Sequence, residues 1–229
     1  MIERRARNTG FSLLEVAIVL LILAALLGSV MRPFGANLVQ RQRQQTMQQL
    51  LDIREAIIGF AAARHRLPCP AQISSAEEGD CSQSSGFVPA VTLGISGPYD
   101  ENDRLVDVWN NPLRYSVSLS DSDADGLPDF TTALQMRHVG MQFLDPDMEV
   151  CADAGCGRYR ANRVPLVLLS TGQNGISTQS EDEAENIDGD LIFVSADPDM
   201  AGDNRFDDLT IWLSANILYS RMLQAGVLP

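Results

Sequence analysis

One apolar stretch near the start of the chain constrains what the chain can fold into. Residues 11–31 are 21 consecutive positions with Glu15 as their only charged side chain. As a helix that rises about 1.5 Å per residue, the stretch spans roughly 30 Å, the thickness of the hydrocarbon core of a bilayer. Three of the first seven residues are arginines, and Arg32 is the first basic residue after the stretch. This asymmetry predicts a transmembrane helix with a cytoplasmic N-terminus and an exported remainder.

Glu15 is the unusual residue of this stretch. A charged side chain at the centre of a membrane helix costs about 2.5 to 3.5 kcal/mol on insertion scales and normally marks a function or a partner. Two other interpretations stay open: Glu15 reaches the membrane edge, or the stretch is a secretory signal cut near Gly28 and Ser29. The second is the weaker, because an ordinary signal peptide has a shorter, uncharged apolar core.

The sequence Gly-Phe-Ser-Leu-Leu-Glu-Val at residues 10–16 resembles the processing site of type IV pilins and type II secretion pseudopilins. The resemblance implies that a prepilin peptidase cuts between Gly10 and Phe11 and methylates the new amino group. It also implies that Glu15 meets the N-terminal amine of a neighbouring subunit during assembly. The apolar helix then stays on the mature protein, which an inner-membrane assembly platform builds into a filament.

This resemblance and the residue pattern divide the chain into three parts. Residues 1–10 are the expected leader, residues 11–64 a long N-terminal helix with 11–31 in the membrane, and residues 65–229 a globular periplasmic or extracellular head. Pro33 and Gly35 predict a kink, after which apolar residues at three- and four-residue spacing predict an amphipathic half. Prolines after Leu67 end the helix.

The head alternates short apolar runs with long polar loops. The runs predict strands bounded by Gly, Pro, Asn or Asp at residues 88–95, 113–119, 164–170, 191–196 and 209–213. A final short helix is expected after Ser214, with Ile217, Leu218, Met222 and Leu223 inward and Gly226 beyond its end. The expected fold class is therefore α+β and pilin-like: a long helix packed on a small antiparallel sheet, with a short C-terminal helix.

Four cysteines in a compartment expected to be oxidising predict two disulfides. Of the three connectivities, we favour Cys69 with Cys81 and Cys151 with Cys156, because each pair closes a short loop. A zinc site is the competing interpretation. The chain has no Cys-x-x-Cys and only two histidines, which disfavours zinc.

Two segments of the head extend the resemblance. Residues 107–115 are similar to the Asp-x-Trp-Gly-Asn-Pro-x-x-Tyr element of the major pseudopilin, with Asn110 in place of the glycine. Residues 170–175, followed after a long acidic loop by 207–212, resemble the calcium-bearing loop and last strand of that family. The resemblance implies calcium ligands at Ser170 and Asp208, although the loop is longer here and Asn174 stands in place of an aspartate.

A separate acidic loop predicts a cation site from its residues alone. Loops with aspartates at positions 1, 3 and 5, glycine at 6 and a backbone carbonyl at 7 wrap calcium. The expected ligands are Asp121, Asp123, Asp125, the carbonyl of Leu127, and Asp129 at position 9. Position 12 is Thr132 instead of the glutamate of an EF-hand. The alternative is an acidic turn whose carboxylates bond their own backbone.

Charge and motifs exclude several classes of function. Seventeen basic against thirty acidic residues give a net charge of −13, which would repel nucleic-acid phosphates. No hydrolase, nucleotide-binding or zinc-protease motif is present, so we expect no enzyme. The function expected is a subunit of a type II secretion pseudopilus or type IV pilus, in contact with other subunits, the prepilin peptidase, the assembly platform and membrane lipid. The alternative is a membrane-tethered, calcium-dependent adhesin or binding domain.

Overall fold

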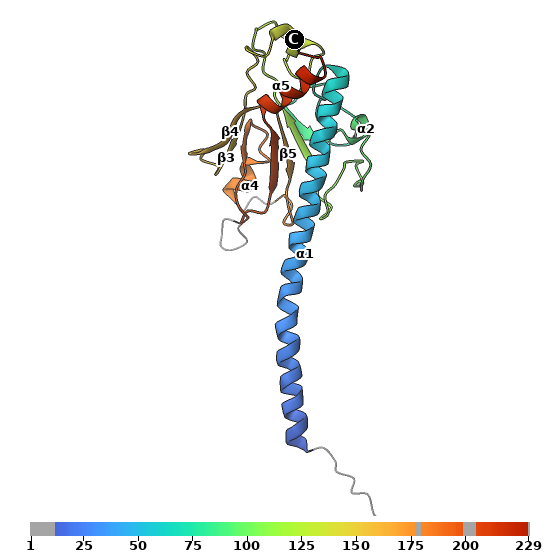
Figure 1. Ribbon diagram of the computed structural model, residues 1–229, viewed down its shortest axis with the longest axis vertical. Helices are drawn as coiled ribbons and strands as arrows, with labels where there is room; N and C mark the ends of the chain where they lie inside the picture. The colour runs from blue at the N-terminus through green and yellow to red at the C-terminus, as the bar shows by residue number, and fades with distance from the viewer. Residues whose placement is uncertain (1–11, 177–179, 199–204, 229) are drawn as a thin grey trace, which may run out of the picture. The chain divides into compact units, whose positions relative to one another are not determined.

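The computed structural model describes residues 12–176, 180–198 and 205–228, without the side chains of residues 27–37. It divides into two compact units, Met1–Gln42 and Arg43–Pro229. Helix α1, Leu13–Arg64, contributes to both units and is continuous through Pro33 and Gly35, where the sequence predicts a kink (Figure 1). The long N-terminal helix is therefore confirmed. Gly10 and Phe11 lie outside the described residues.

The described part of the first unit is an apolar helical stretch that begins at a capped turn. The backbone N–H of Glu15 donates to the hydroxyl of Ser12 at 3.2 Å, which makes Ser12 the cap of α1. Large apolar side chains follow and are exposed, from Leu13 at 90% to Leu26 at 58%. Within the described part of the chain, no helix meets the length and hydropathy required to cross a membrane. The predicted segment 11–31 extends beyond the described side chains at both of its ends.

The second unit contains two sheets where the sequence predicts one. Four antiparallel strands form the first sheet in the order β1-β2-β5-β7. The second has the order β4-β3-β6, with β3 and β6 parallel. The strand bounds are β1 Ser85–Phe87, β2 Arg114–Val117, β3 Met148–Cys151, β4 Tyr159–Val164, β5 Leu166–Ser170, β6 Ile192–Val194 and β7 Leu209–Leu213.

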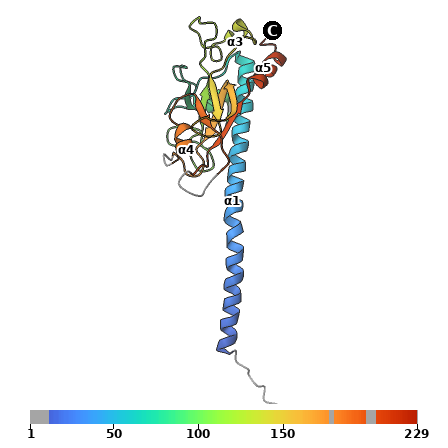
Figure 2. The same ribbon diagram turned by 90° about the vertical axis from the view of Figure 1, so that its left-hand side faces the viewer.

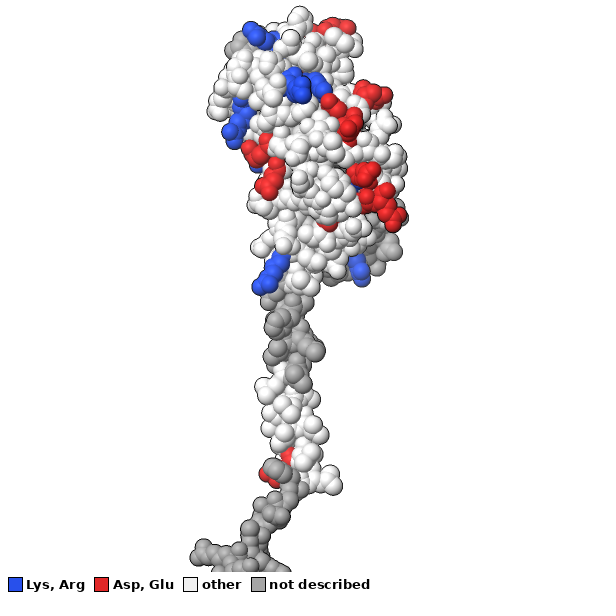
Figure 3. Space-filling model, turned by 90° about the vertical axis from the view of Figure 1, so that its right-hand side faces the viewer, with Lys and Arg blue, Asp and Glu red and all other residues white. Residues whose placement is uncertain are grey.

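Four shorter helices complete this unit: α2 Ala90–Leu93, α3 Gln135–Val139, α4 Glu181–Glu185 and α5 Ala215–Gln224. Figure 2 shows α3 and α5 at one end of the unit and α4 toward the opposite end. On the face in Figure 3, acidic side chains gather in several patches with arginines between them. The acidic character of the chain is therefore a property of the head.

The main core lies between α1 and the four-stranded sheet. Leu50, Ile53 and Ile57 of α1 are at most 1% exposed and pack in one cluster with residues of β2, β5, β7 and α5. Their spacing of three and four places them on one helix face. The opposite face of β5 contributes Val167 to a smaller cluster with the second sheet. Strand β5 is therefore covered on both faces, which explains why it is buried throughout.

Several sequence expectations are wrong in detail. Residues 88–95 form α2 and a turn instead of a strand, because Gly94 ends the segment at a φ of 67°. Strands β1, β3 and β4 were not predicted; most of β4 is exposed and lacks an apolar alternation. In α5, Leu218 and Met222 are buried as predicted, but Ile217 and Leu223 are 49% and 41% exposed, and Tyr219 is buried in their place.

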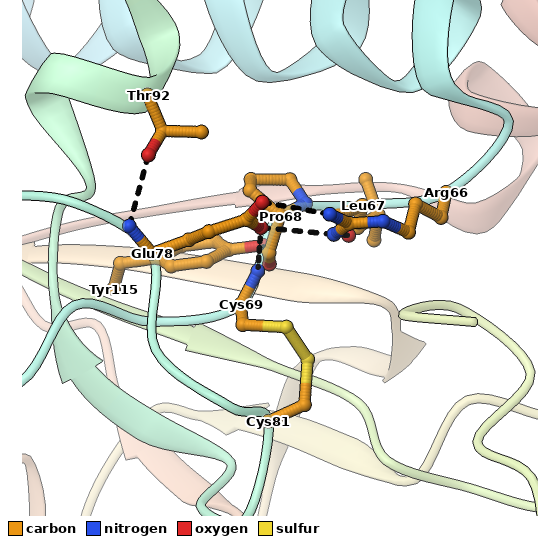
Figure 4. Close-up of polar contacts among 8 residues, drawn as sticks. All are labelled: Arg66, Leu67, Pro68, Cys69, Glu78, Cys81, Thr92 and Tyr115. Atoms are coloured by element: carbon orange, nitrogen blue, oxygen red, sulfur yellow. Dashed lines mark hydrogen bonds and ion pairs between the residues drawn. A yellow bond between two sulfur atoms is a disulfide. The ribbon is translucent and has the colours of Figure 1, made fainter. Parts of the chain in front are cut away.

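The segment after α1 is fixed by a disulfide and an ion pair (Figure 4). The predicted pairing of the cysteines is the observed one, with Cα–Cα distances of 4.9 Å for Cys69–Cys81 and 5.1 Å for Cys151–Cys156. The Arg66 guanidinium donates to both carboxylate oxygens of Glu78, at 2.9 and 2.7 Å. The backbone N–H of Cys69 also donates to Glu78, at 3.2 Å. This cluster ties the end of α1 to the loop closed by the first disulfide.

We predict that Glu78→Gln destabilises the chain by about 1 to 2 kcal/mol, because it replaces a bidentate, charge-assisted pair whose side chains are about three-quarters buried. Burial acts to raise the pKa of Glu78, but the hydrogen bonds from Arg66 and Cys69 outweigh it and the pKa is lowered. The stability that Glu78 contributes is therefore lost as the pH falls through the range where this carboxyl is protonated. Thermal unfolding between pH 3 and 7 measures both effects.

The matched control is Glu77→Gln, which removes the same charge from an exposed neighbour. It should leave the unfolding temperature unchanged. Equal effects of the two substitutions would mean that the ion pair contributes nothing beyond the general charge.

Candidate functional site

The structure brings together the two head segments that carry the family resemblance. One oxygen of Asp107 accepts the backbone N–H groups of Trp109 and Asn111, at 2.8 and 2.9 Å. The other oxygen accepts the hydroxyl of Ser170 at 2.6 Å. The Asn111 amide donates to the carbonyl of Gly172, also at 2.6 Å. Residues 107–111 and 170–172 therefore form one hydrogen-bonded unit at the end of β5.

Asn110, which replaces the glycine of the similar element, has a φ of 68°. This left-handed conformation costs glycine nothing and is tolerated by asparagine better than by most other residues. The substitution therefore keeps the turn geometry that the glycine would give. It does not weaken the resemblance.

Beside this unit lies a cluster of three buried carboxylates, Glu183, Asp207 and Asp208. One oxygen from each lies within 4.8 Å of the others. Glu183 comes from α4, whose first turn is capped by Ser180, and the two aspartates precede β7. A Cβ on Gly172 would overlap the carboxylate of Asp207, so the glycine allows the 170–175 loop to approach the cluster. We call these three carboxylates the acidic site.

Hydrogen bonds hold each carboxylate of the acidic site in place. The Asn174 amide donates to both oxygens of Glu183, at 3.0 and 2.9 Å. One oxygen of Asp207 accepts the backbone N–H groups of Gln173 and Asn174. One oxygen of Asp208 accepts the Asn186 amide at 2.8 Å. The Oδ1 atoms of Asp207 and Asp208 are buried and have no hydrogen-bond partner within the described part of the chain.

The electrostatics of the acidic site are unfavourable without a cation. Burial, with smaller contributions from Glu183 and Asp207, raises the pKa of Asp208 to about 8 against the opposing effects of Asn186 and Arg114. Burial is also the main cause that raises the pKa of Glu183 and of Asp207. Arg43 donates to the backbone carbonyl of Asp207 at 2.8 Å. Among the described residues, no arginine pairs with any of the three carboxylates.

Such an arrangement can hold a hard divalent cation. Calcium takes six to eight oxygen ligands, and the three carboxylates, two of them with an unpartnered oxygen, provide the start of such a shell. The nearby hydroxyl of Ser170 donates to Asp107 and lies beside this shell.

The structure places the predicted ligands differently from the expectation. Asp208 belongs to the acidic site, whereas Ser170 bonds Asp107 beside it. Glu183 and Asp207 were not among the predicted ligands. Their signals were present in the sequence, because Asp207 adjoins Asp208 and Glu183 lies in the long acidic loop between residues 175 and 207.

The predicted calcium loop is only partly assembled. Carboxylate oxygens of Asp121, Asp123 and Asp129 lie within 4.8 Å of one another. Asp125 does not join them: it accepts the Gln135 amide at 2.6 Å and shares a second group with Asp123 and His138. The side chain of Leu127 is 46% exposed. Three of the four predicted carboxylates therefore converge.

Comparison with known proteins bears on the N-terminus alone. Residues 5–31 match the family model of the prokaryotic N-terminal methylation motif, the prepilin-type signal of type IV pilins and pseudopilins. No curated protein and no solved structure matches the chain significantly. The chain therefore carries the signal of a pilin-like precursor.

We predict that the cation-free protein loses stability as the pH rises. The folded state holds a proton on Asp208 up to about pH 8, whereas an unfolded aspartate has lost it above about pH 4. The free energy of unfolding should therefore fall between pH 4 and 8, by up to about 5 kcal/mol from this group. Thermal unfolding in EDTA across this range measures the slope.

Asp208→Asn should flatten that slope and raise the unfolding temperature at pH 8, because the amide keeps the size of the side chain and never ionises. Asp147→Asn, at an exposed position, is the matched control and should retain the slope of the unmodified chain. A cation-free protein whose stability increases from pH 5 to 8 would contradict the prediction.

Proposed function

We propose that the chain is a structural subunit of a type II secretion pseudopilus or a type IV pilus. In this proposal a prepilin peptidase cuts after Gly10 and methylates the amine of Phe11. The subunit then polymerises from the inner membrane through its N-terminal helix, with its head in the periplasm or, in a filament, outside the cell. The observation that carries the proposal is the methylation motif at residues 5–31, which contains both the cleavage position and Glu15.

The exposed start of α1 supports an assembly role. Between Ser12 and Leu26, Glu15 is the only charged residue, on a helix whose large apolar side chains are exposed in the single chain. An exposed apolar surface of this kind needs lipid or neighbouring helices to cover it. Once neighbouring helices exclude water, a carboxylate needs a cation, and the free amine of the next subunit supplies one without any additional residue.

The composition of the chain permits a specific test of this pairing. All 17 of its basic Lys and Arg residues are arginines, so the N-terminal amine is the only amine that a carbodiimide can join to a carboxylate. We predict that an apolar carbodiimide links the Phe11 amine of one subunit to Glu15 of the next in assembled material. A covalent dimer on a denaturing gel, and the joined peptide in mass spectra, are the expected results.

Glu15→Gln should abolish the covalent dimer and the sheared filaments, because the amide neither reacts nor pairs with the amine. Glu55→Gln, an exposed glutamate farther along the same helix, is the matched control and should retain both. Intact-mass measurement of the same samples should find a chain that begins at N-methylated Phe11 only when the peptidase is present.

Other results would point to another function. A processed or unprocessed chain that stays anchored, never forms the dimer and is unaffected by Glu15→Gln would favour the membrane-tethered adhesin or binding domain. A chain cut near Ser29 would mean that the apolar stretch is an ordinary secretory signal.

We also propose that the acidic site binds calcium and thereby stabilises the head. The residues fit the ion, because oxygen is the only ligand type at the site and two buried carboxylate oxygens lack a partner. Glu183, Asp207 and Asp208 would supply the charge. The ion would join α4 to the start of β7 and to the loop that Asn174 holds against Glu183.

Calcium should therefore raise the unfolding temperature of the unmodified chain at pH 8, by the equivalent of about 2.7 kcal/mol at one hundred times its dissociation constant. Calorimetric unfolding with and without calcium measures this shift. Asp208→Asn should lose most of it, whereas Asp147→Asn should keep it. An unmodified chain that unfolds at the same temperature with and without calcium would remove the acidic site from the proposal and leave the assembly role untouched.

A further inference from the structure

The segment between β2 and α3 forms a second concentration of carboxylates, distinct from the acidic site. Asp125 accepts the amide of Gln135, the first residue of α3, at 2.6 Å. This contact places the loop beside α3, whereas the acidic site includes a residue of α4 toward the other end of the unit (Figure 2). The two carboxylate groups are therefore far apart in the fold and share no residue.

The backbone of the loop folds back on Asp121. Its two carboxylate oxygens accept the N–H groups of Asp125 and Gly126, at 3.1 and 2.8 Å. Gly126 has a φ of 86°, a conformation that favours glycine. These bonds alone fit an acidic turn that satisfies its own backbone. They explain Asp121 and the position of the glycine, but they do not explain the rest of the loop.

Asp129 is the residue that a simple turn leaves unexplained. Its side chain is fully buried, and one oxygen accepts the backbone N–H and the hydroxyl of Ser122, at 3.0 and 2.5 Å. The other oxygen, Oδ1, is buried without a hydrogen-bond partner among the described residues. A buried carboxylate with an unpartnered oxygen is costly unless a cation meets it.

The surroundings of Asp129 make that cost larger. Asp121 and Asp123 bring two further carboxylates within 4.8 Å of it. The exposed His138 lies beside the cluster, with its Nε2 3.8 Å from Asp123. Among the described residues, no arginine forms an ion pair with any of the three. Three carboxylates therefore share one small space without an arginine to compensate their charge.

We propose that residues 121–129 form a second calcium site, in which the carboxylates of Asp121, Asp123 and Asp129 bind the ion. Asp129 anchors the site to the buried side of the loop, and Asp121 and Asp123 close it from the outer side. The carbonyl of Leu127 is the expected backbone ligand. The loop lacks the glutamate that gives EF-hands their tightest binding, so its dissociation constant falls in the range of about 10⁻⁴ to 10⁻³ M of extracellular modules.

Binding at this site orders a defined segment of the head. The hydroxyl of Ser122, which bonds Asp129, also accepts the backbone N–H of Asp145 at 3.1 Å. Together with the contact between Asp125 and Gln135, this bond connects the loop to both ends of the segment that contains α3. Arg137 lies in that segment and is exposed. Calcium therefore controls how readily a protease reaches the peptide bond after Arg137.

The test uses the full chain in detergent micelles, with the calcium ion as the probe. Limited trypsin digestion is carried out across 0.1 to about 5 mM calcium, a range that covers the expected dissociation constant. Cleavage after Arg160, which is exposed and outside the segment, is the reference within each reaction. We expect calcium to slow cleavage at Arg137 relative to Arg160 by about fivefold or more, since cleavage requires local opening.

Three variants decide between the outcomes. Asp123→Asn, at an exposed position, should abolish the protection of Arg137 and reduce the calcium bound per chain from two ions to one by titration calorimetry. Glu101→Gln, an exposed charge elsewhere, should change neither, and Asp208→Asn should lose the other ion while keeping the protection. Protection or a second ion that survives Asp123→Asn would overturn the proposal, as would an unmodified chain that binds only the ion lost in Asp208→Asn.

Discussion

Burying a carboxylate away from water costs several kcal/mol unless a cation or several hydrogen-bond donors contact it. The stability of the fold depends on how this cost is offset at each buried carboxylate. For Glu78 the compensation comes from within the chain, because Arg66 and the backbone N–H of Cys69 donate hydrogen bonds to it. The acidic site and Asp129 are compensated only in part. Hydrogen bonds reach some of their carboxylate oxygens, whereas other buried oxygens have no partner among the described residues. Arginine compensates Glu78, and in the proposed function a cation from solution compensates the carboxylates that no arginine pairs with.

The same constraint applies to Glu15 at the other end of the chain. Its stretch of α1 exposes a nearly uncharged surface, and any lipid or helix that covers this surface also removes water from the carboxylate. Glu15 and the buried carboxylates of the head differ in the source of the cation that would compensate them. In the head the proposed partner is an ion, and in the proposed filament it is the amine of another subunit. A chain without lysine has a single mobile amine to offer, which makes the pairing unambiguous.

The sequence predicted the features that depend on local chemistry. The long helix, both disulfides, the strands at β2, β5, β6 and β7, and the final helix all follow from spacing, turn residues or apolar runs. The second sheet was not predicted from the sequence, because β4 is largely exposed and β3 pairs in parallel with a strand some forty residues later. The acidic site shows the same limit. Asp208 was predicted, but its meeting with Glu183 depends on α4 folding back beside β7, which no local pattern encodes.

The disulfides and the proposed calcium sites of the head both depend on conditions that are found outside the cytoplasm. Disulfides persist in oxidising compartments, and a calcium site of millimolar affinity fills only where calcium is abundant. If both carboxylate clusters bind calcium as proposed, the head lacks these ions until it is exported, and it becomes fully stable only afterwards. The order in which the parts of the chain become stable would then match the order of events in the proposed export and assembly of the subunit. In that proposed route the apolar helix would hold the chain at the membrane first, and the head would be stabilised on the far side before the assembly that involves Glu15.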